Sequence, residues 1–181
     1  SGFEVVLVDV GCLGTPSVQA DVPREAVFEA AGTTLAAARE QGDRGVAIRS
    51  AAAGAAAITR AAFQAGRIEG ALAIGGSAGS TIGAAALREL PLGVPKVLVS
   101  TLAAGQTRPY VGGKDITLIN PVVDLAGLNR ITRAVLTNAA GALIGMLQQS
   151  PPVAPQHERP LIAATMFGVT TPCVEHARKL L

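Results

Sequence analysis

A short apolar run that ends in a glycine-rich turn places the strongest constraint on the fold of this 181-residue chain. Residues 71–74 (ALAI) lead into residues 75–81 (GGSAGST), and helix-forming residues follow them. A strand, a tight turn and a helix in this order are typical of a βαβ unit. Such a turn presents main-chain N–H groups at the positive end of a helix dipole, where an anion such as a phosphate binds.

Further candidate strands and helices alternate along the chain. The expected strands are 3–10, 71–74, 96–100 and 115–119, and the expected helices are 23–30, 35–41, 44–65, 81–90 and 124–149. Because the strand segments are apolar on both faces, they predict a parallel sheet that helices cover on both sides. The fold class is therefore α/β, a Rossmann-like doubly wound sheet.

Prolines mark a domain boundary near the C-terminus. Residues 1–150 are expected to form the first Rossmann-like nucleotide-binding subdomain, and the proline-rich residues 151–160 a linker. A strand at 161–165 and a helix from Cys173 predict the start of a second Rossmann-like lobe within 161–181. We therefore expect the chain to be a fragment of a longer protein.

Composition excludes several classes of partner. The net charge is +2 without a basic run and aromatic residues make up 3%, which argues against a nucleic-acid-binding protein. No apolar run is long enough to span a membrane. Cys12 and Cys173 lie far apart without metal-ligand spacing, which favours two reduced thiols in a cytoplasmic protein.

Polar residues follow each predicted strand, and ligands of such sheets bind at the carboxyl ends of the strands. The candidate phosphate contacts of the glycine turn are Gly75, Gly76, Ser77, Gly79, Ser80 and Thr81. Ser100, Thr101 and Gly105 would flank them, and Gly168, Thr170 and Thr171 would close the site from the second lobe. Lys114 is a candidate counter-charge, and Asp115 a candidate ligand for magnesium.

The glycine turn also contains the pattern GxSxG of a serine-hydrolase nucleophile elbow, with Ser77 as the nucleophile. Asp115 or Asp124 could then serve as the acid, although Asp124 is also a candidate helix cap. The available bases are His157, in the proline linker, and His176, on the last helix. These are poor positions for a rigid general base, so this alternative is the weaker one.

The predicted helix 124–149 is rich in alanine and contains Gly127, Gly141 and Gly145. Small side chains permit a close approach of another helix. This helix could therefore pack within the domain or form the seam of a homodimer, and the sequence does not choose between them.

The chain resembles a family through four segments: GGSAGST, LPLGVPKVLVSTLAAGQTRPYVGGKDITL, VVDLAGLNRITRAVLTNAAGALIGM and TMFGVTTPCV. The family is that of the tomato mosaic virus resistance protein and its uncharacterised bacterial relatives. The resemblance implies paired Rossmann-like subdomains that bind ATP, with magnesium left open. Two positions depart from the family pattern, because Ala78 replaces a glycine, and Gly113 a threonine or serine. From the resemblance we also expect an opening strand with an acidic, threonine-containing loop, which family members carry before the position of Ser1, to lie outside this sequence.

The sequence and the resemblance together favour an ATP-binding domain of a regulatory or interaction protein. An ATP-dependent enzyme acting on a small carboxylate or sugar is the alternative, followed by the serine hydrolase. The sequence identifies neither catalytic residues nor a protein partner. We do not expect a role in virus resistance for this chain from the resemblance to the plant protein.

Overall fold

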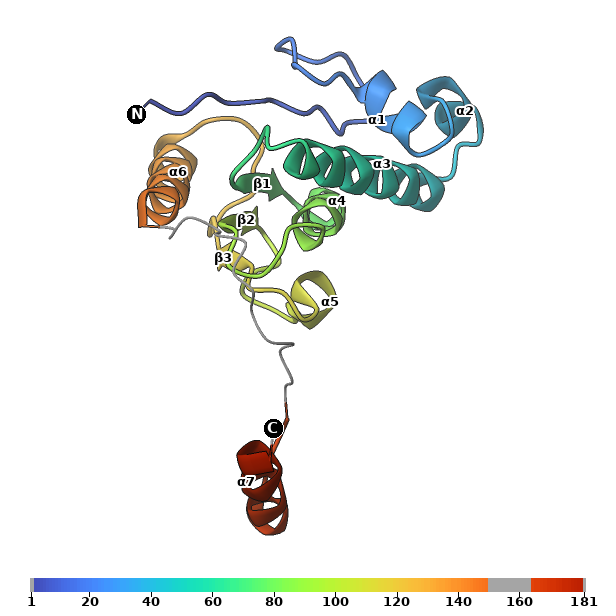
Figure 1. The fold of residues 1–181 in the computed structure, drawn as a ribbon. Coiled ribbons are helices and arrows are strands. Elements are labelled where there is room, and N and C mark those ends of the chain that lie inside the picture. The colour runs from blue at the N-terminus through green and yellow to red at the C-terminus, as the bar shows by residue number, and fades with distance from the viewer. Residues whose placement is uncertain (1, 150–163, 181) are drawn as a thin grey trace. The chain divides into compact units, whose positions relative to one another are not determined.

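The computed structural model of the chain describes residues 2–149 and 164–180. The chain divides into two units, Ser1–Ser150 and Pro151–Leu181, which are described separately. In the first unit, three parallel strands in the order β1–β2–β3 form a sheet with helices on both faces (Figure 1). This arrangement confirms the predicted α/β class and is consistent with a Rossmann-like fold.

The elements of the first unit have the following bounds. The helices are α1 (Arg24–Ala30), α2 (Leu35–Glu40), α3 (Arg44–Gln64), α4 (Ser77–Arg88), α5 (Arg108–Val111) and α6 (Arg130–Gln149). The strands are β1 (Ala71–Gly75), β2 (Lys96–Ser100) and β3 (Thr117–Ile119). The short helix α5 lies between the predicted strands 96–100 and 115–119, where no helix is predicted.

The central strand β2 is buried along its whole length, as its apolar sequence predicts. Leu98 packs with Leu87 of α4 on one face of the sheet, and Val97 and Val99 pack with Ala139 of α6 on the other. Helix α3 packs on α4, and α1 and α2 pack on α3 (Figure 1). The apolar core of the first unit therefore continues from one face of the sheet into the three N-terminal helices.

Helix α1 crosses α3 at very short range because Gly54 of α3 has no side chain. A Cβ atom at Gly54 would overlap the carbonyl oxygen of Val27, which is fully buried in α1. Gly141 of α6 is the opposite case, because a Cβ atom there would have no neighbour within 4 Å. Substitution of Gly54 therefore tests the packing of α1 on α3, whereas substitution of Gly141 tests only the low helix propensity of glycine.

We expect Gly54→Ala to lower the free energy of unfolding by roughly 1–3 kcal/mol, since α1 must shift away from α3. Gly141→Ala should raise it by about 0.5–1 kcal/mol, since alanine is the better helix former. Urea denaturation of both variants measures the difference. Two effects of the same sign would contradict the crossing.

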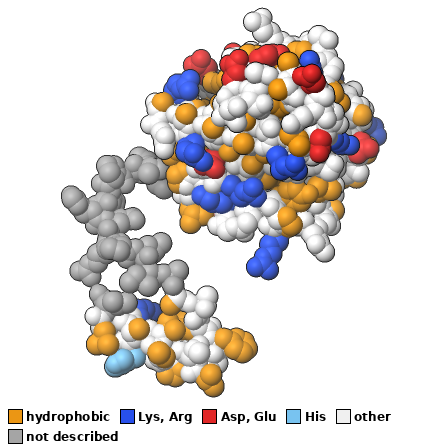
Figure 2. All heavy atoms as spheres, turned by 90° about the vertical axis from the view of Figure 1, so that its right-hand side faces the viewer, with side chains coloured by type: hydrophobic (Ala, Val, Ile, Leu, Met, Phe, Trp, Pro, Cys, Tyr) orange, Lys and Arg blue, Asp and Glu red, His pale blue; other side chains and the backbone are white. Residues whose placement is uncertain are grey.

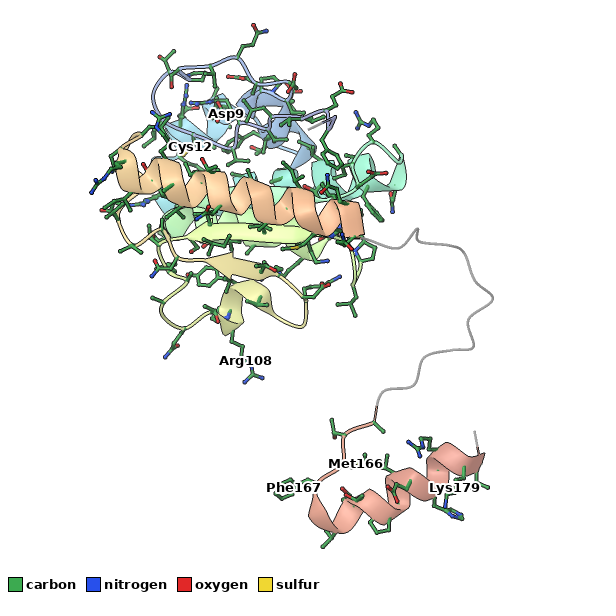
Figure 3. All side chains as sticks on the ribbon, turned by 90° about the vertical axis from the view of Figure 1, so that its left-hand side faces the viewer. Asp9, Cys12, Arg108, Met166, Phe167 and Lys179 are labelled. Atoms are coloured by element: carbon green, nitrogen blue, oxygen red, sulfur yellow. The ribbon has the colours of Figure 1, made fainter. Side chains whose placement is uncertain are left out.

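Helix α6 runs antiparallel to β1. A Cβ atom at Gly70, just before β1, would lie 3.1 Å from Cδ2 of Leu147, so the C-terminal end of α6 lies at the amino end of β1. Figure 3 shows α6 lying along the sheet. Neither Gly141 nor Gly145 would bring a Cβ atom within 4 Å of a neighbour. The described part of the first unit does not pack against these glycines.

The start of α6 corrects the sequence prediction, which placed it at Asp124. The helix begins at Arg130, because the side chain of Asn129 caps it. Oδ1 of Asn129 accepts hydrogen bonds from the N–H groups of Ile131 (2.8 Å) and Thr132 (3.0 Å). The N–H of Asn129 in turn donates to Oγ1 of Thr132 at 2.8 Å. Asp124 is therefore part of the preceding loop, and the prediction that it caps the helix is wrong.

The prediction of a buried strand at residues 3–10 is also wrong. Val8 forms one isolated parallel bridge with Val22, and Val5 is 78% exposed. The pairing does not continue, because the next residue, Pro23, has no N–H to donate and α1 begins directly after it. Among the described residues, β1 is hydrogen-bonded to β2 alone, so residues 3–10 do not pair with β1. The apolar segment therefore stays outside the three-stranded sheet.

Charged side chains of both signs share the face of the first unit that Figure 2 presents. Acidic side chains gather along its upper edge, and the basic side chains below are interrupted by acidic ones. In the same unit, an ion pair links α3 to the residue that follows α4, with Nε of Arg60 2.7 Å from Oε2 of Glu89. This face therefore carries no unbroken basic stripe.

The described part of the second unit contains a 3₁₀ helix, Gly168–Thr170, and helix α7 (Thr171–Leu180). Phe167, directly before them, is 90% exposed (Figure 3). The predicted linker 151–160 lies outside the described residues, as do residues 161–163 of the predicted strand. Residues 164 and 165 are not in a strand. Across both described segments, no helix has the length and apolarity needed to cross a membrane.

Candidate functional site

The glycine turn forms the junction of β1 and α4. Gly76 is the N-cap residue, and α4 begins at Ser77, one turn earlier than the predicted start near Thr81. A Cβ atom at Gly75 would lie 2.6 Å from Cα of Gly79, which real structures do not tolerate. The main chain therefore closes on itself here, and the closure requires glycine at position 75.

The first turn of α4 offers main-chain N–H groups at a positive helix end. The N–H of Ser80 already has a partner, since it donates to the carbonyl of Gly76 at 2.7 Å. The N–H groups of Ser77, Ala78 and Gly79 precede it and have no partner within the helix. Ala78 is absent from the contacts predicted from the sequence, which are the glycine, serine and threonine residues of the turn. Its contribution comes from the main chain, which the residue type does not reveal.

Two predicted phosphate contacts, Ser80 and Ser100, instead bind each other. Their Oγ atoms are 2.6 Å apart and both residues are buried. Oγ of Ser80 also donates to the carbonyl of Gly75 at 3.2 Å, and Oγ of Ser100 accepts from the N–H of Leu102 at 3.0 Å. This pair ties the carboxyl ends of β1 and β2 together and so positions the turn.

The remaining predicted contacts of the first unit border the turn to different degrees. Thr101 lies beside it, because a Cβ atom at Gly76 would be 3.7 Å from Oγ1 of Thr101. The hydroxyl of Thr81 donates to the carbonyl of Ser77 within α4, at 3.1 Å. Gly105 is exposed in the loop that follows β2. Thr101 is thus the side-chain hydroxyl that the structure places at the turn from the neighbouring strand.

The carboxyl ends of all three strands lie in a row. Gly75 is in register with Ser100, and Val99 with Ile119. The connection after β2 contains α5, which packs against α4, whereas the connection after β3 leads to α6 on the opposite face (Figure 1). Connections that leave neighbouring strands toward opposite faces open a crevice at the carboxyl ends, where ligands bind in open α/β sheets.

The loop after β3 is part of this edge. The sequence places residues 120–124 at the carboxyl end of a predicted strand, but none of them is among the candidate contacts. Val122 has a φ of +68°, and its N–H donates to Oδ1 of Asn120 at 3.0 Å. A β-branched residue in this region of backbone space is a strained outlier. The Asn–Pro dipeptide at 120–121 is the turn signal that could have drawn attention to this loop.

The structure does not bring Lys114 to the glycine turn. Its Nζ donates to the carbonyl of Leu90 at 3.0 Å, beyond the C-terminal end of α4. Since α4 has 12 residues, its two ends are roughly 18 Å apart. Lys114 therefore lies at the amino edge of the sheet, where it offers no counter-charge to an anion at the turn.

Asp115 lies at the same amino edge and pairs with the fully buried Lys96. Oδ1 of Asp115 is 2.8 Å from Nζ of Lys96, which also donates to the carbonyls of Pro91 and Val94. Oδ2 of Asp115 accepts from the N–H of Gly93 at 2.8 Å. Burial raises the pKa of Asp115, but the hydrogen bonds from Lys96 and Gly93 outweigh this effect and hold the pKa below its usual 3.8. The carboxylate of Asp115 therefore stabilises the fold at the amino edge of the sheet, and it does not lie at the opposite edge with the glycine turn.

We expect Asp115→Asn to lower the free energy of unfolding by about 1–2 kcal/mol near neutral pH, since Lys96 loses its anionic partner. Because the pKa of Asp115 is lowered by folding, its stabilisation is complete above the unfolded-state pKa of about 3.8. It is lost as the pH falls through the folded-state value. Urea denaturation across a pH series should show the two proteins converging in acid.

Asp124→Asn is the matched control, because Asp124 is an exposed loop carboxylate of the same unit. It should leave the free energy of unfolding within about 0.5 kcal/mol of the parent value. A difference for Asp115→Asn that does not change with pH would contradict the ion pair.

We expect Gly75→Ala and Gly76→Ala to differ strongly in stability. At position 75 the added methyl group collides with Gly79 and should cost roughly 1–3 kcal/mol. At position 76 the φ of −75° suits any residue and the nearest neighbour is 3.7 Å away, so the cost should be below about 0.5 kcal/mol. Urea denaturation measures both, and equal effects would contradict the closed turn.

A second polar cluster lies around Arg24, whose side chain is 8% exposed. Nη2 of Arg24 is 2.7 Å from Oδ2 of Asp9, and Nη1 donates to the carbonyls of Leu13 and Gly14. The cluster lines a cavity of about 400 Å³ between residues 7–11 and the loop 15–20. Since Asp9 neutralises the guanidinium, the cluster holds the loop and has no net positive charge for an anion.

The second unit contains the predicted contacts Gly168, Thr170 and Thr171. Oγ1 of Thr170 accepts from the N–H of Phe167 at 3.0 Å and so caps the 3₁₀ helix that starts at Gly168. Thr171 is the first residue of α7. Their closure over the glycine turn stays a prediction. In the described segments of the chain, no three His, Cys, Asp or Glu side chains are grouped to hold a metal ion.

Comparison with known proteins identifies the family. Residues 1–152 match the N-terminal domain of the Uncharacterised protein family UPF0261. The chain belongs to this family. A UPF0261 protein of Clostridium tetani is 43% identical over 180 residues, which cover 99% of this chain and 44% of that protein. A UPF0261 protein of Rhizobium meliloti is 43% identical over 174 residues, covering 96% of the chain and 42% of the relative.

The tomato relatives match over a shorter region. The ToMV resistance protein Tm-1(GCR237) of Solanum lycopersicum is 42% identical over 118 residues, or 63% of this chain and 16% of that protein. The ToMV susceptible protein tm-1(GCR26) matches with the same values. This chain is therefore equally similar to the resistance protein and to the susceptible protein. The chain spans less than half of the length of each of these relatives.

Proposed function

We propose that this chain is a nucleotide-binding domain of a regulatory or interaction protein, and that it holds the phosphates of ATP at the N-terminal turn of α4. The observation that carries this proposal is the group of main-chain N–H donors at Ser77, Ala78 and Gly79. They lie at the positive end of a 12-residue helix, and Gly75 and Gly76 leave the space before them free of side chains.

The surroundings of the turn support the proposal. Thr101 brings a hydroxyl group beside Gly76, and the buried pair of Ser80 and Ser100 fixes the turn before any ligand binds. A rigid arrangement of donors binds an anion without a cost for ordering the site. The choice of ATP as the nucleotide rests on what the sequence resemblance implies.

The serine-hydrolase alternative gains no support. Ser77 lies in the first unit, whereas both histidines of the sequence, His157 and His176, belong to residues 151–181. A cytoplasmic location is part of the proposal, and it is consistent with Cys12 and Cys173, which are free thiols.

Calorimetric titration of the chain with ATP and magnesium tests the proposal through Gly76→Asp. Position 76 has room for a side chain, so the variant should fold. A carboxylate about 4 Å from a phosphate oxygen adds a repulsion of about 4 kcal/mol at an effective dielectric constant near 20. We expect the affinity for ATP to fall by at least about 100-fold.

Gly76→Ala is the control, because it adds a side chain at the same position without a charge and without an oxygen atom that would accept the N–H groups of α4. It should keep the affinity within about threefold of the parent chain, which corresponds to less than about 1 kcal/mol. Thermal denaturation of both variants excludes unfolding as the cause. The proposal would be overturned if the parent chain did not bind ATP, or if the Gly76→Asp variant bound ATP with the affinity of the parent chain.

A further inference from the structure

We infer that the loop between β3 and α6, residues 120–129, holds the base of the nucleotide, with Val122 and Leu128 as its apolar contacts. This inference rests on the proposed function and adds the second half of the site. It starts from Val122, whose backbone is strained and whose side chain nonetheless points to solvent. Val122 is 76% exposed, so no packing in the described part of the chain accounts for a valine at this position.

The strain at Val122 is imposed by its neighbours. Oδ1 of Asn120 accepts the N–H of Val122 at 3.0 Å, and the intervening Pro121 is fully buried. These two residues hold the backbone of Val122 at a φ of +68°, which glycine would adopt without cost. Strained residues that the surrounding structure holds in place cluster at ligand sites.

Leu128 adds a second exposed apolar side chain to the same loop. It is 67% exposed, and Ile131, in the first turn of α6, is 44% exposed. The ring faces of a nucleobase are apolar, whereas its phosphates are charged. A loop with apolar side chains and a turn with N–H donors are therefore suited to the two ends of one nucleotide.

The geometry of α6 places this loop at the carboxyl edge of the sheet. Leu147 lies at the amino end of β1, and Ile131 is 16 residues earlier in the same helix, or roughly 24 Å away along its axis. The five residues of β1 span only about 17 Å. The start of α6 thus reaches the edge where the glycine turn lies.

The spacing of the strands matches an extended nucleotide. β1 leads to the glycine turn and β3 to the loop with Val122, and one strand lies between them. Two strand spacings amount to roughly 10 Å. A nucleotide lying across the crevice would pass Ser100 and Thr101 and reach both ends of the site.

Titration with ATP and with inorganic triphosphate tests the assignment, because the second ligand has the phosphates without the base. Val122→Gly removes the side chain and the strain, and Leu128→Ser removes the second contact. We expect each variant to bind ATP about tenfold more weakly than the parent chain, because the base no longer buries an apolar side chain when it binds. Both should bind triphosphate as the parent chain does. The Tm of Val122→Gly should be no lower than that of the parent chain.

Leu92→Ser is the matched control, because Leu92 is 65% exposed at the amino edge of the sheet. It should leave both affinities unchanged. Unchanged ATP binding by Val122→Gly and Leu128→Ser would overturn the assignment while leaving the proposed function intact, and so would an equal loss of both ligands. A parent chain that binds neither ligand would overturn the proposed function as well. A change confined to self-association, measured by sedimentation, would assign the loop to a second copy of the chain instead.

Discussion

Two polar side chains at the ends of the buried strand β2 determine how the first unit is assembled around it. Lys96 begins the strand and Ser100 ends it, and both are at most 2% exposed. A buried ammonium group without partners would cost several kcal/mol, so the chain must bring oxygen atoms to it. The loop after α4 and Asp115 do so at one end. Ser80 meets Ser100 at the other, and so fixes the glycine turn.

The sequence predicts the elements whose pattern is local. The apolar run of β2, the alanine-rich α3 and the turn at Gly75 and Gly76 all appear where periodicity and glycine content place them. Residues 3–10 have an equally apolar pattern, yet they form one bridge. A strand also requires a neighbour with free N–H and carbonyl groups, and Pro23 ends the pairing. That requirement depends on distant residues and is not visible in the segment itself.

The candidate site also contains features that the sequence does not predict. Lys114 is charged and close in sequence to a predicted strand, but its loop lies at the amino edge, and the residue type does not tell which edge a loop occupies. Ala78 and Val122 are neither glycines nor polar residues, so their residue types do not mark them as candidate contacts. Ala78 contributes a main-chain donor, and Val122 is exceptional through its backbone angle. Backbone properties of this kind require coordinates.

Among residues 2–149 and 164–180, β1 pairs with a strand on one side only, which affects how the chain behaves at high concentration. Its outer edge, ALAIG, contains neither a charged residue nor a proline, the usual means by which proteins block the addition of a foreign strand. With a net charge of +2, repulsion between copies is weak. In the part of the chain that the structure describes, this edge therefore presents its N–H and carbonyl groups to a strand of another molecule, and its five residues take no part in the hydrophobic packing of the N-terminal helices.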